Sequence, residues 1–368
     1  MEDMEYMGMA VRLAQKGCGL VNPNPMVGAV LVKEGRIIGE GYYERYGALH
    51  AERNAILNCR ESPEGTTLYV TLEPCCHHGK TPPCTEAILQ SGIRRVVIGS
   101  HDPNPLVKGK GIKQLREQGI EVVEDVLKEE CDKLNEVFFH FIQTGKPYVV
   151  MKYAMTMDGK TAAYTGASKW ITGEDARRRV HEDRRRYSAV MVGIGTVLAD
   201  DPLLTCRLEN GRNPLRIICD TQLHTPLDSR IVLTASKVPT VIATSSMERE
   251  AHQPYIKAGC RILPVSQKDG HLDLARLMAK LGEEKIDSVL LEGGGILNWS
   301  ALQAGIVNKV QAYLAPKLLG GAAGKTPVAG IGVPSPEAGY FLTNSTITCL
   351  GEDILIESEV QPHVYRNH

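Results

Sequence analysis

The sequence predicts two α/β domains, one over residues 1–146 and the other over residues 147–368. Short apolar strands alternate with amphipathic helices along most of the chain, which is typical of sheets covered by helices. The length of 368 residues suits two domains. The segment Thr144-Gly145-Lys146-Pro147 interrupts the pattern with glycine and proline, as a domain boundary does.

The elements expected in the first domain begin with a helix, because apolar residues recur at helical spacing between Met1 and Gly17. Four strands are predicted at Val27–Val32, Thr66–Thr71, Arg95–Ser100 and Ile120–Glu124. Three helices are predicted at His50–Cys59, Thr81–Gln90 and Gly109–Gln118. A longer helix is expected over Val126–Gln143, where the apolar residues on one side are Leu127, Cys131, Leu134, Phe138 and Phe141.

The second domain reads in the same way. Its predicted strands are Tyr148–Ala154, Ala189–Gly193, Leu215–Asp220, Thr240–Thr244, Ser288–Glu292 and Val310–Ala315. Its predicted helices are Gly173–Arg186, Leu272–Leu281 and Gly295–Ala304. The tail from Tyr340 to Glu357 alternates in the manner of strands, so we expect it to close the sheet as a hairpin.

Composition excludes several classes of protein. Hydrophobic residues make up 43% of the chain and charged residues 23%, which is ordinary for a globular protein. The formal net charge of −1 argues against a strongly basic nucleic-acid binder. No apolar run approaches the length of a membrane span, and the N-terminus lacks the layout of a secretion signal, so a cytoplasmic location is expected. Ten cysteines in such a chain favour metal ligands or reactive thiols over a disulfide scaffold.

A zinc site is indicated by His50, Cys75 and Cys84. One imidazole and two thiolates supply three ligands, and a fourth position left for water distinguishes catalytic from structural zinc. Glu52 lies two residues beyond His50, where a carboxylate could move protons beside the metal without binding it. A His-x-Glu followed by Pro-Cys is the signature of zinc nucleobase deaminases, here His50-Ala51-Glu52 and Pro74-Cys75.

The alternative is a structural zinc. It would need a fourth protein ligand, and Cys76, His77 and His78 are near enough in sequence to be candidates. A second thiol at Cys76 also leaves open which cysteine binds. We expect His77 and His78 to lie around the substrate rather than on the metal.

These motifs resemble the cytidine-deaminase superfamily, although the interval from Cys75 to Cys84 is longer than its compact Cys-x-x-Cys. The run Thr71-Leu72-Glu73-Pro74-Cys75 through Gly79-Lys80-Thr81-Pro82-Pro83-Cys84 is similar to one branch, the bifunctional deaminase/reductase of riboflavin biosynthesis. Asn22-Pro23-Asn24-Pro25 and Asp102-Pro103-Asn104-Pro105-Leu106-Val107 resemble it too, and the likeness extends over nearly the whole chain. Cys76 departs from the family, which more often has serine there.

The resemblance implies a three-layer α/β/α deaminase domain followed by a dihydrofolate-reductase-like domain that uses NADPH. Asn24 is expected to contact a pyrimidine or a sugar, because its amide offers donors and an acceptor. Its alternative role is a turn between two prolines.

Glycine-rich turns point to a nucleotide site in the second domain, although Gly-x-Gly-x-x-Gly is absent. Residues 193–202 and 292–298 each follow a predicted strand, and glycines there would let a phosphate approach backbone N–H groups at a helix N-terminus. Tight packing explains such a turn equally well. Lys152, at the end of the first strand, could assist protonation near the reacting carbon.

The resemblance assigns residues to this site. Cofactor contacts are implied for Ala154, Trp170, Thr196, Asp200, Thr221, Gly294, Gly295, Ile296, Leu297, Asn298, Trp299 and Ser300. Substrate contacts are implied for Ser168, Arg184, Leu204, Arg207 and Glu292. Arginine can hold a sugar phosphate with two parallel hydrogen bonds. The arginine-rich run over residues 177–186 is otherwise read as a solvated helix face, because acids are interleaved with its bases.

The expected function has two consecutive steps: zinc-dependent hydrolytic deamination of a diaminopyrimidine ribosyl phosphate, then NADPH-dependent reduction of its ribosyl chain to ribityl. This identity follows from the resemblance, which also implies a homo-oligomer. Two rival functions remain open at this stage. One is a tRNA or nucleotide deaminase with an accessory domain, and the other is a zinc-stabilised binding module with no activity.

Overall fold

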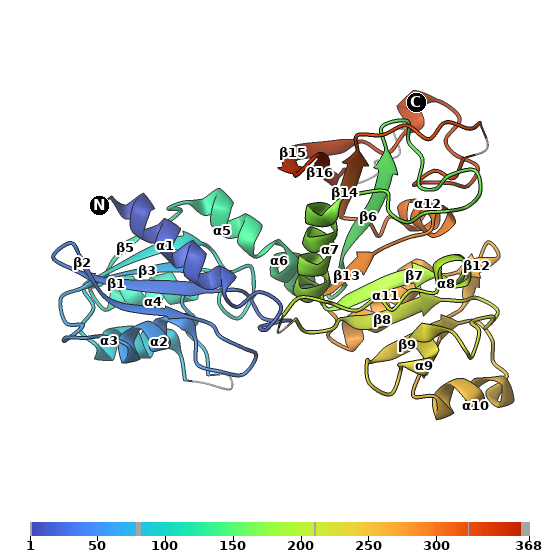
Figure 1. Cartoon of the computed structure of the whole chain (residues 1–368). Helices are drawn as coiled ribbons and strands as arrows, with labels where there is room; N and C mark the ends of the chain where they lie inside the picture. The colour runs from blue at the N-terminus through green and yellow to red at the C-terminus, as the bar shows by residue number, and fades with distance from the viewer. Residues whose placement is uncertain (1, 79–81, 210, 323, 362–368) are drawn as a thin grey trace. The chain divides into compact units, whose positions relative to one another are not determined.

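The computed structural model describes residues 2–78, 82–209, 211–322 and 324–361 (Figure 1). The chain divides into two compact units, Met1–Gly145 and Lys146–His368. Each unit has its own sheet and its own core, and each is described by itself. Among the described residues, no helix combines the length and the apolar character needed to cross a membrane.

The first unit is built on a five-stranded sheet in the order β2-β1-β3-β4-β5. β1 pairs antiparallel with β2 and β3, whereas β3, β4 and β5 are parallel to one another. The strands are β1 Gly28–Lys33, β2 Arg36–Tyr42, β3 Thr67–Leu72, β4 Arg95–Ser100 and β5 Glu121–Val123. The four strands predicted from the sequence are confirmed.

β2 was not predicted, and its glycines explain why. Gly39 and Gly41 leave gaps in the alternation of side chains along the strand. A Cβ on Gly39 would lie 2.4 Å from the carbonyl oxygen of Ala55, and a Cβ on Gly41 would lie 2.3 Å from its nitrogen. The glycines therefore let a helix lie directly on the strand, at the expense of the apolar pattern that predicts strands.

Helices cover both faces of this sheet, which confirms the three-layer α/β/α architecture. They are α1 Asp3–Gln15, α2 Ala51–Leu57, α3 Cys84–Gln90, α4 Lys110–Glu117, α5 Lys128–Leu134 and α6 Glu136–Thr144. In β1, Val30 and Val32 pack in the cluster that includes α1, whereas Ala29 and Leu31 pack in the cluster that includes α2, α3 and α4. The strand alternation thus divides one apolar run between two cores.

The single helix predicted over Val126–Gln143 is wrong. The structure has two helices, α5 and α6, separated at Asn135, whose ψ of 19° at φ −110° is not helical. The side-chain amide of Asn135 accepts a hydrogen bond from the Met26 N–H at 2.8 Å and donates one to the Met26 carbonyl at 3.0 Å. Apolar periodicity continues across this break, so only the tertiary contact reveals it. The helix predicted from Thr81 begins at Cys84, and Thr81 lies outside the described residues.

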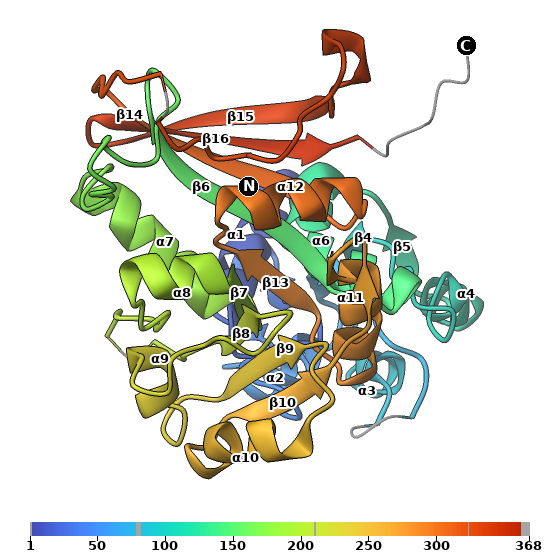
Figure 2. The same cartoon turned by 90° about the vertical axis from the view of Figure 1, so that its right-hand side faces the viewer.

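The second unit is built on a nine-stranded sheet in the order β10-β9-β8-β7-β13-β6-β14-β16-β15 (Figure 2). The first seven strands in that order are parallel, and β16 and β15 are antiparallel to their neighbours. The strands are β6 Tyr148–Thr156, β7 Ala189–Gly193, β8 Leu215–Cys219, β9 Thr240–Thr244, β10 Arg261–Pro264, β13 Ser288–Leu291, β14 Lys309–Ala315, β15 Leu342–Leu350 and β16 Asp353–Val360. A separate two-stranded ribbon joins β11 Gln267–Lys268 to β12 His271–Leu272.

Helices pack on both faces of this sheet as well. They are α7 Glu174–Arg186, α8 Ile194–Asp200, α9 Arg230–Leu233, α10 Arg249–Lys257, α11 Leu274–Glu283 and α12 Gly295–Gln303. α11 and α12 contribute to one core, and α8, α9 and α10 contribute to a second core on the same strands. The predicted tail hairpin is confirmed as β15 and β16, and β16 attaches it to β14. Short elements such as α9 and β10 were not predicted.

Candidate active sites

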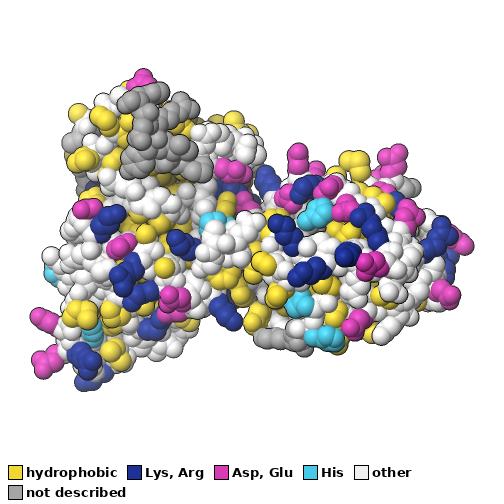
Figure 3. Space-filling view, turned by 180° about the vertical axis from the view of Figure 1, so that it is seen from behind, with side chains coloured by type: hydrophobic (Ala, Val, Ile, Leu, Met, Phe, Trp, Pro, Cys, Tyr) yellow, Lys and Arg dark blue, Asp and Glu magenta, His cyan; other side chains and the backbone are white. Residues whose placement is uncertain are grey.

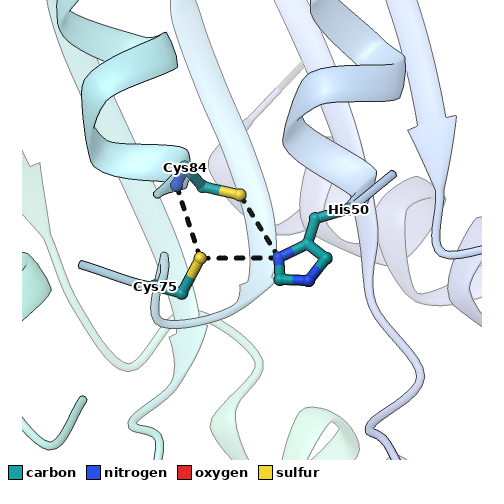
Figure 4. A group of neighbouring side chains, drawn as sticks. All are labelled: His50, Cys75 and Cys84. Carbon is teal, nitrogen blue, oxygen red and sulfur yellow. Dashed lines mark hydrogen bonds between the residues drawn. The ribbon is translucent and has the colours of Figure 1, made fainter. Parts of the chain in front are cut away.

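In the first unit, His50, Cys75 and Cys84 converge on one point (Figure 4). The Nδ1 atom of His50 lies 3.4 Å from the sulfur of Cys75 and 3.4 Å from the sulfur of Cys84. The three ligand atoms all lie within 4.8 Å of one another. One imidazole nitrogen and two sulfurs at this spacing are a donor set that suits zinc.

Two helix starts and one strand end bring these residues together. His50 is extended and directly precedes α2, Cys75 follows β3, and Cys84 is the first residue of α3. The Cys84 backbone N–H donates a hydrogen bond to the Cys75 sulfur at 3.3 Å. The Arg53 guanidinium donates to the carbonyl of Pro83 at 2.8 Å. This hydrogen bond links the residue before Cys84 to α2, to which Arg53 belongs.

The two thiols differ in their readiness to ionise. Hydrogen bonds from Cys84 and His50 lower the pKa of Cys75, whereas the nearby sulfur of Cys75 and burial raise the pKa of Cys84. The hydrogen bond with Cys75 raises the pKa of His50. The surroundings thus favour the thiolate form of Cys75 and disfavour that of Cys84. A divalent ion at the centre would supply the charge that both thiolates require.

Glu52 is the buried carboxyl of this site, with only 3% of its surface exposed. Burial raises the pKa of Glu52, and the neighbouring Cys75 raises it further. Glu52 belongs to the first turn of α2, so its backbone is fixed by the helix that His50 precedes. A carboxyl whose pKa lies above its usual range is suited to accept a proton and return it.

A closed, four-ligand site is not supported by the described residues. No further histidine, cysteine or carboxylate joins the three in the cluster. The sulfur of Cys76 donates to the carbonyl of Leu106 at 3.8 Å, away from the cluster, so Cys75 is the better ligand of the two. His78 pairs with Glu86 at 3.3 Å. The part of the motif at residues 79–81 lies outside the described residues.

A cavity of about 280 Å³ opens beside the three residues. His50, Glu52 and Cys75 form part of its wall, and His77 lines it as expected. The other lining residues include Asn24, Tyr43, Asp102, Asn104, Val107 and Phe138.

The side chain of Asn24 is held by an aromatic neighbour. Its amide nitrogen donates to the Tyr43 hydroxyl at 3.0 Å, and its carbonyl oxygen has room to accept. On the opposite loop, burial raises the pKa of Asp102 to about 6. The next loop is fixed by Glu73, which accepts the backbone N–H groups of Gly109 and Gly111 at 3.0 and 3.1 Å. The wall thus offers several polar groups within a lining that is largely apolar. Tyr43 and Phe138 were missed from the sequence, because neither belongs to a motif.

In the second unit, a cavity of about 720 Å³ lies where β6, β7, β8 and β13 end. The carboxyl edge of parallel strands is the usual ligand site of such sheets. Of the expected cofactor residues, those that line the cavity are Ala154, Thr196, Asp200, Thr221, Gly294, Gly295, Ile296, Leu297, Asn298 and Ser300. Of the expected substrate residues, Ser168 and Glu292 line it.

Five of the expected residues do not line this cavity: Trp170, Trp299, Arg184, Leu204 and Arg207. Trp170 is exposed, and the Arg177 guanidinium stacks 4.4 Å from the centre of its ring. Trp299 packs edge-on against Tyr340. The Arg207 side chain donates to the ring of His181 at 3.1 Å.

Arg184 and Glu292 bind one another. The Nε and Nη2 atoms of Arg184 donate to the two carboxylate oxygens of Glu292 at 2.6 and 2.7 Å. Burial works against the charge of Glu292, but Arg184 holds the pKa of this carboxyl below its usual range. Lys152 lies close by, and burial lowers its pKa. The pair therefore lies next to an ammonium group whose pKa is lowered by burial.

Lining residues that were not predicted from the sequence include Thr161, His271 and Lys325. They come from connections that are far apart in the chain. Only the folded structure brings them to one cavity.

Comparison with known proteins identifies the types of both domains. Residues 1–100 match the family model of the cytidine and deoxycytidylate deaminase zinc-binding region. Residues 147–356 match the model of the RibD C-terminal domain. Both expected fold classes are thereby confirmed.

Curated relatives and solved structures extend the match to the whole chain. The riboflavin biosynthesis protein RibD of Actinobacillus pleuropneumoniae is 54% identical, over 97% of this chain and 95% of that protein. A diaminohydroxyphosphoribosylaminopyrimidine deaminase/5-amino-6-(5-phosphoribosylamino)uracil reductase from Thermotoga maritima has a TM-score of 0.84 at 41% identity, covering 98% of this chain and 99% of that one. RibD of Acinetobacter baumannii has a TM-score of 0.84 at 34% identity, with the same coverage. The chain therefore belongs to the RibD family and is a bifunctional enzyme of riboflavin biosynthesis, in which a zinc-dependent deaminase region precedes an NADPH-dependent reductase domain.

Proposed function

We propose that this enzyme catalyses two consecutive reactions on one pyrimidine. The first removes the 2-amino group of 2,5-diamino-6-ribosylamino-4(3H)-pyrimidinone 5′-phosphate by hydrolysis. The second reduces the ribosyl group of 5-amino-6-ribosylaminouracil 5′-phosphate to ribityl with NADPH. The observation that carries the proposal is the convergence of His50, Cys75 and Cys84 beside the buried Glu52, in a chain similar to a relative that bears both activities in its name.

We assign deamination to residues 1–146 and reduction to residues 147–368. His50, Cys75 and Cys84 would hold the zinc ion, because their three donor atoms already lie within 4.8 Å of one another. When bound, zinc acts as a Lewis acid and makes water a nucleophile near neutral pH.

Glu52 is the proton carrier in this proposal. Its carboxylate accepts a proton from the attacking water and delivers it to a ring nitrogen of the substrate. It then takes the proton of the hydroxyl group newly attached to carbon and passes it to the amino group, which leaves as ammonia while the carbonyl forms. The raised pKa of Glu52 supports both transfers, because a carboxyl of higher pKa binds the proton more firmly before passing it on. Asn24 and Asp102 line the same cavity and face the substrate there.

The experiment that tests the deaminase proposal is Glu52→Gln in the full-length enzyme. Ammonia release from the diaminopyrimidine is expected to fall by about 10²–10⁴-fold, the usual contribution of a positioned acid–base group. Zinc content, measured by atomic emission, is expected to stay at that of the wild type. Glu117→Gln, which removes an exposed carboxylate on α4, is the matched control. Activity retained by Glu52→Gln, or release of ammonia from cytidine or tRNA in place of the diaminopyrimidine, would contradict the proposal.

In the reductase unit, the cofactor residues would be Ala154, Trp170, Thr196, Asp200, Thr221 and the segment Gly294–Ser300. The lining of the 720 Å³ cavity supports most of these, since it includes all but Trp170 and Trp299. The cofactor supplies the hydride. Substrate contacts are assigned to Ser168, Arg184, Leu204, Arg207 and Glu292. The protein's part is to position the donor and the sugar chain.

The two reactions can be separated in one protein. Cys84→Ser is expected to abolish ammonia release and to leave NADPH oxidation intact when the deaminated pyrimidine is supplied. Loss of both activities in a variant that remains folded by circular dichroism would contradict the division of labour between the units.

The enzyme is further proposed to work in the cytoplasm as a homo-oligomer that binds no nucleic acid and no membrane. No disulfide joins any described cysteines, which suits a reducing compartment. On the face drawn in Figure 3, basic and acidic side chains are interspersed.

β15 ends the nine-stranded sheet, and Ile347 on it is 70% exposed, as expected of an edge that pairs with a second copy. Sedimentation of Ile347→Lys as a smaller species than wild type would support this assembly, and unchanged sedimentation would contradict it.

A further inference from the structure

Residues 324–329, here called the strap, contribute Lys325, Thr326, Pro327 and Ala329 to the lining of the reductase cavity. Both the N–H and the hydroxyl of Thr161 donate to the carbonyl of Lys325, at 3.0 and 3.3 Å. At the other end, the Ala329 N–H donates to the carbonyl of Gly295 at 3.0 Å. Between these points, the side chain of Asn298 donates to the carbonyl of Pro327 at 2.8 Å. The strap backbone is thus fastened to the loop after β6 and to the first turns of α12.

The strap lies directly on the glycine-rich turn. A Cβ on Gly295 would be 2.9 Å from the carbonyl oxygen of Thr326 and 3.0 Å from the Cβ of Ala329. Gly293 and Gly294 have φ values of +75° and +44°, which favour glycine, so this turn keeps its backbone clear of side chains. The cavity therefore has the N-terminus of α12 in its wall with the strap packed against it.

Lys325 is the strap's charged side chain, and it lines the cavity. Within the described part of the chain, its ammonium group forms no hydrogen bond and no ion pair with the protein. The other lysine of this lining, Lys152, is buried in the field of Glu292. An exposed ammonium with no ion-pair partner among the described residues, on a strap that packs against a helix N-terminus in the cavity wall, is suited to an anionic ligand.

We propose that Lys325 binds the diphosphate of the nicotinamide cofactor, together with the backbone N–H groups at the start of α12. This inference rests on the proposed reductase function. The diphosphate is the part of the cofactor that glycine-rich turns at helix N-termini hold, and the strap packs on that turn. Lys325 adds a point charge to a site that the helix dipole already favours.

The test compares cofactor affinity in Lys325→Gln and wild type by isothermal titration calorimetry, with NADPH and NADH as probes. Loss of one charge-assisted contact is expected to weaken both by about tenfold. NADPH and NADH share the diphosphate, so the two losses should be equal. Lys325→Arg should recover most of the affinity. Lys257→Gln, on α10 and outside the cavity lining, should bind both cofactors like wild type.

Three results would overturn the inference. Equal cofactor affinity in Lys325→Gln and wild type would refute the contact but leave the reductase function standing. A loss confined to NADPH would place Lys325 on the 2′-phosphate, and a higher KM for the pyrimidine with unchanged cofactor affinity would place it on the substrate. If wild type itself binds neither cofactor, the proposed reductase function fails, and this inference fails with it.

Discussion

The ion pair between Arg184 and Glu292 makes a quantitative prediction about stability. The two side chains are only 13% and 9% exposed, and they form two parallel hydrogen bonds of 2.6 and 2.7 Å. Glu292→Gln keeps the size of the side chain but leaves the guanidinium of Arg184 buried without its counter-charge. Removing one partner of a buried pair costs about 3–5 kcal/mol. We expect about 3 kcal/mol, because glutamine still offers one acceptor and Arg184 also donates to the carbonyl of Thr205.

A double-mutant cycle isolates the interaction. Arg184→Met leaves the carboxylate of Glu292 beside Lys152 alone, so it should also destabilise the unit. The double variant carries neither buried charge of the pair, and its loss should be smaller than the sum of the single losses by about 2 kcal/mol.

The assay is urea unfolding followed by tryptophan fluorescence. The chain has two tryptophans, Trp170 and Trp299, and both belong to the second unit, so the signal reports on that unit alone. The matched control is Glu284→Gln, which breaks an Arg261–Glu284 pair of the same forked geometry whose side chains are 46% and 36% exposed. Exposed pairs contribute under about 1 kcal/mol. The reasoning is refuted if Glu292→Gln costs no more than Glu284→Gln, or if the cycle is additive.

Three further predictions address the metal, the pH dependence and the packing of the first unit. Cys84→Ser should weaken zinc binding by more than about 100-fold, whereas Cys76→Ser should retain zinc after dialysis; equal losses would contradict the assigned ligands. Burial raises the pKa of Asp183 from 3.8 to about 6, so the unfolded chain loses this proton at lower pH than the folded one. The second unit of the wild type should therefore lose roughly 2–3 kcal/mol of stability between pH 4 and pH 6. The Asp183→Asn variant should not show this loss. Parallel urea profiles for the two proteins across that range would disprove this. Gly28→Ala would place a Cβ 2.0 Å from the carbonyl oxygen of Ala10 in α1, so the melting temperature should fall by several degrees; an unchanged value would argue against that close packing.

Much of the fold was predictable because each strand carries its own apolar pattern. β7 and β9 were placed to the residue, and the tail hairpin was found from alternation alone. The failures share one cause, which is a contact between segments that are distant in the sequence. β2 lacks an alternating apolar pattern because it carries glycines where α2 packs against it. The break at Asn135 depends on a contact with Met26, more than one hundred residues earlier.

The sequence alone predicts the residues of the two sites to different extents. Three metal ligands and a carboxylate follow from residue chemistry and motif, because His50, Glu52 and Cys84 lie at the starts of two helices and Cys75 follows one strand. The reductase cavity is assembled from many separate loops, so its residues came from family resemblance. That resemblance could not reveal that Arg184 and Glu292 pair with each other.

The amide of Asn135 has a consequence for where the deaminase ends. It holds Met26 next to the cavity residue Asn24, while Phe138, from the following helix, forms part of the cavity wall. A protein truncated at residue 100 would keep every proposed metal ligand and still lose one side of the chamber that receives the pyrimidine. The deaminase unit is therefore larger than its zinc-binding region, because residues after position 100 help to build the wall of the substrate cavity.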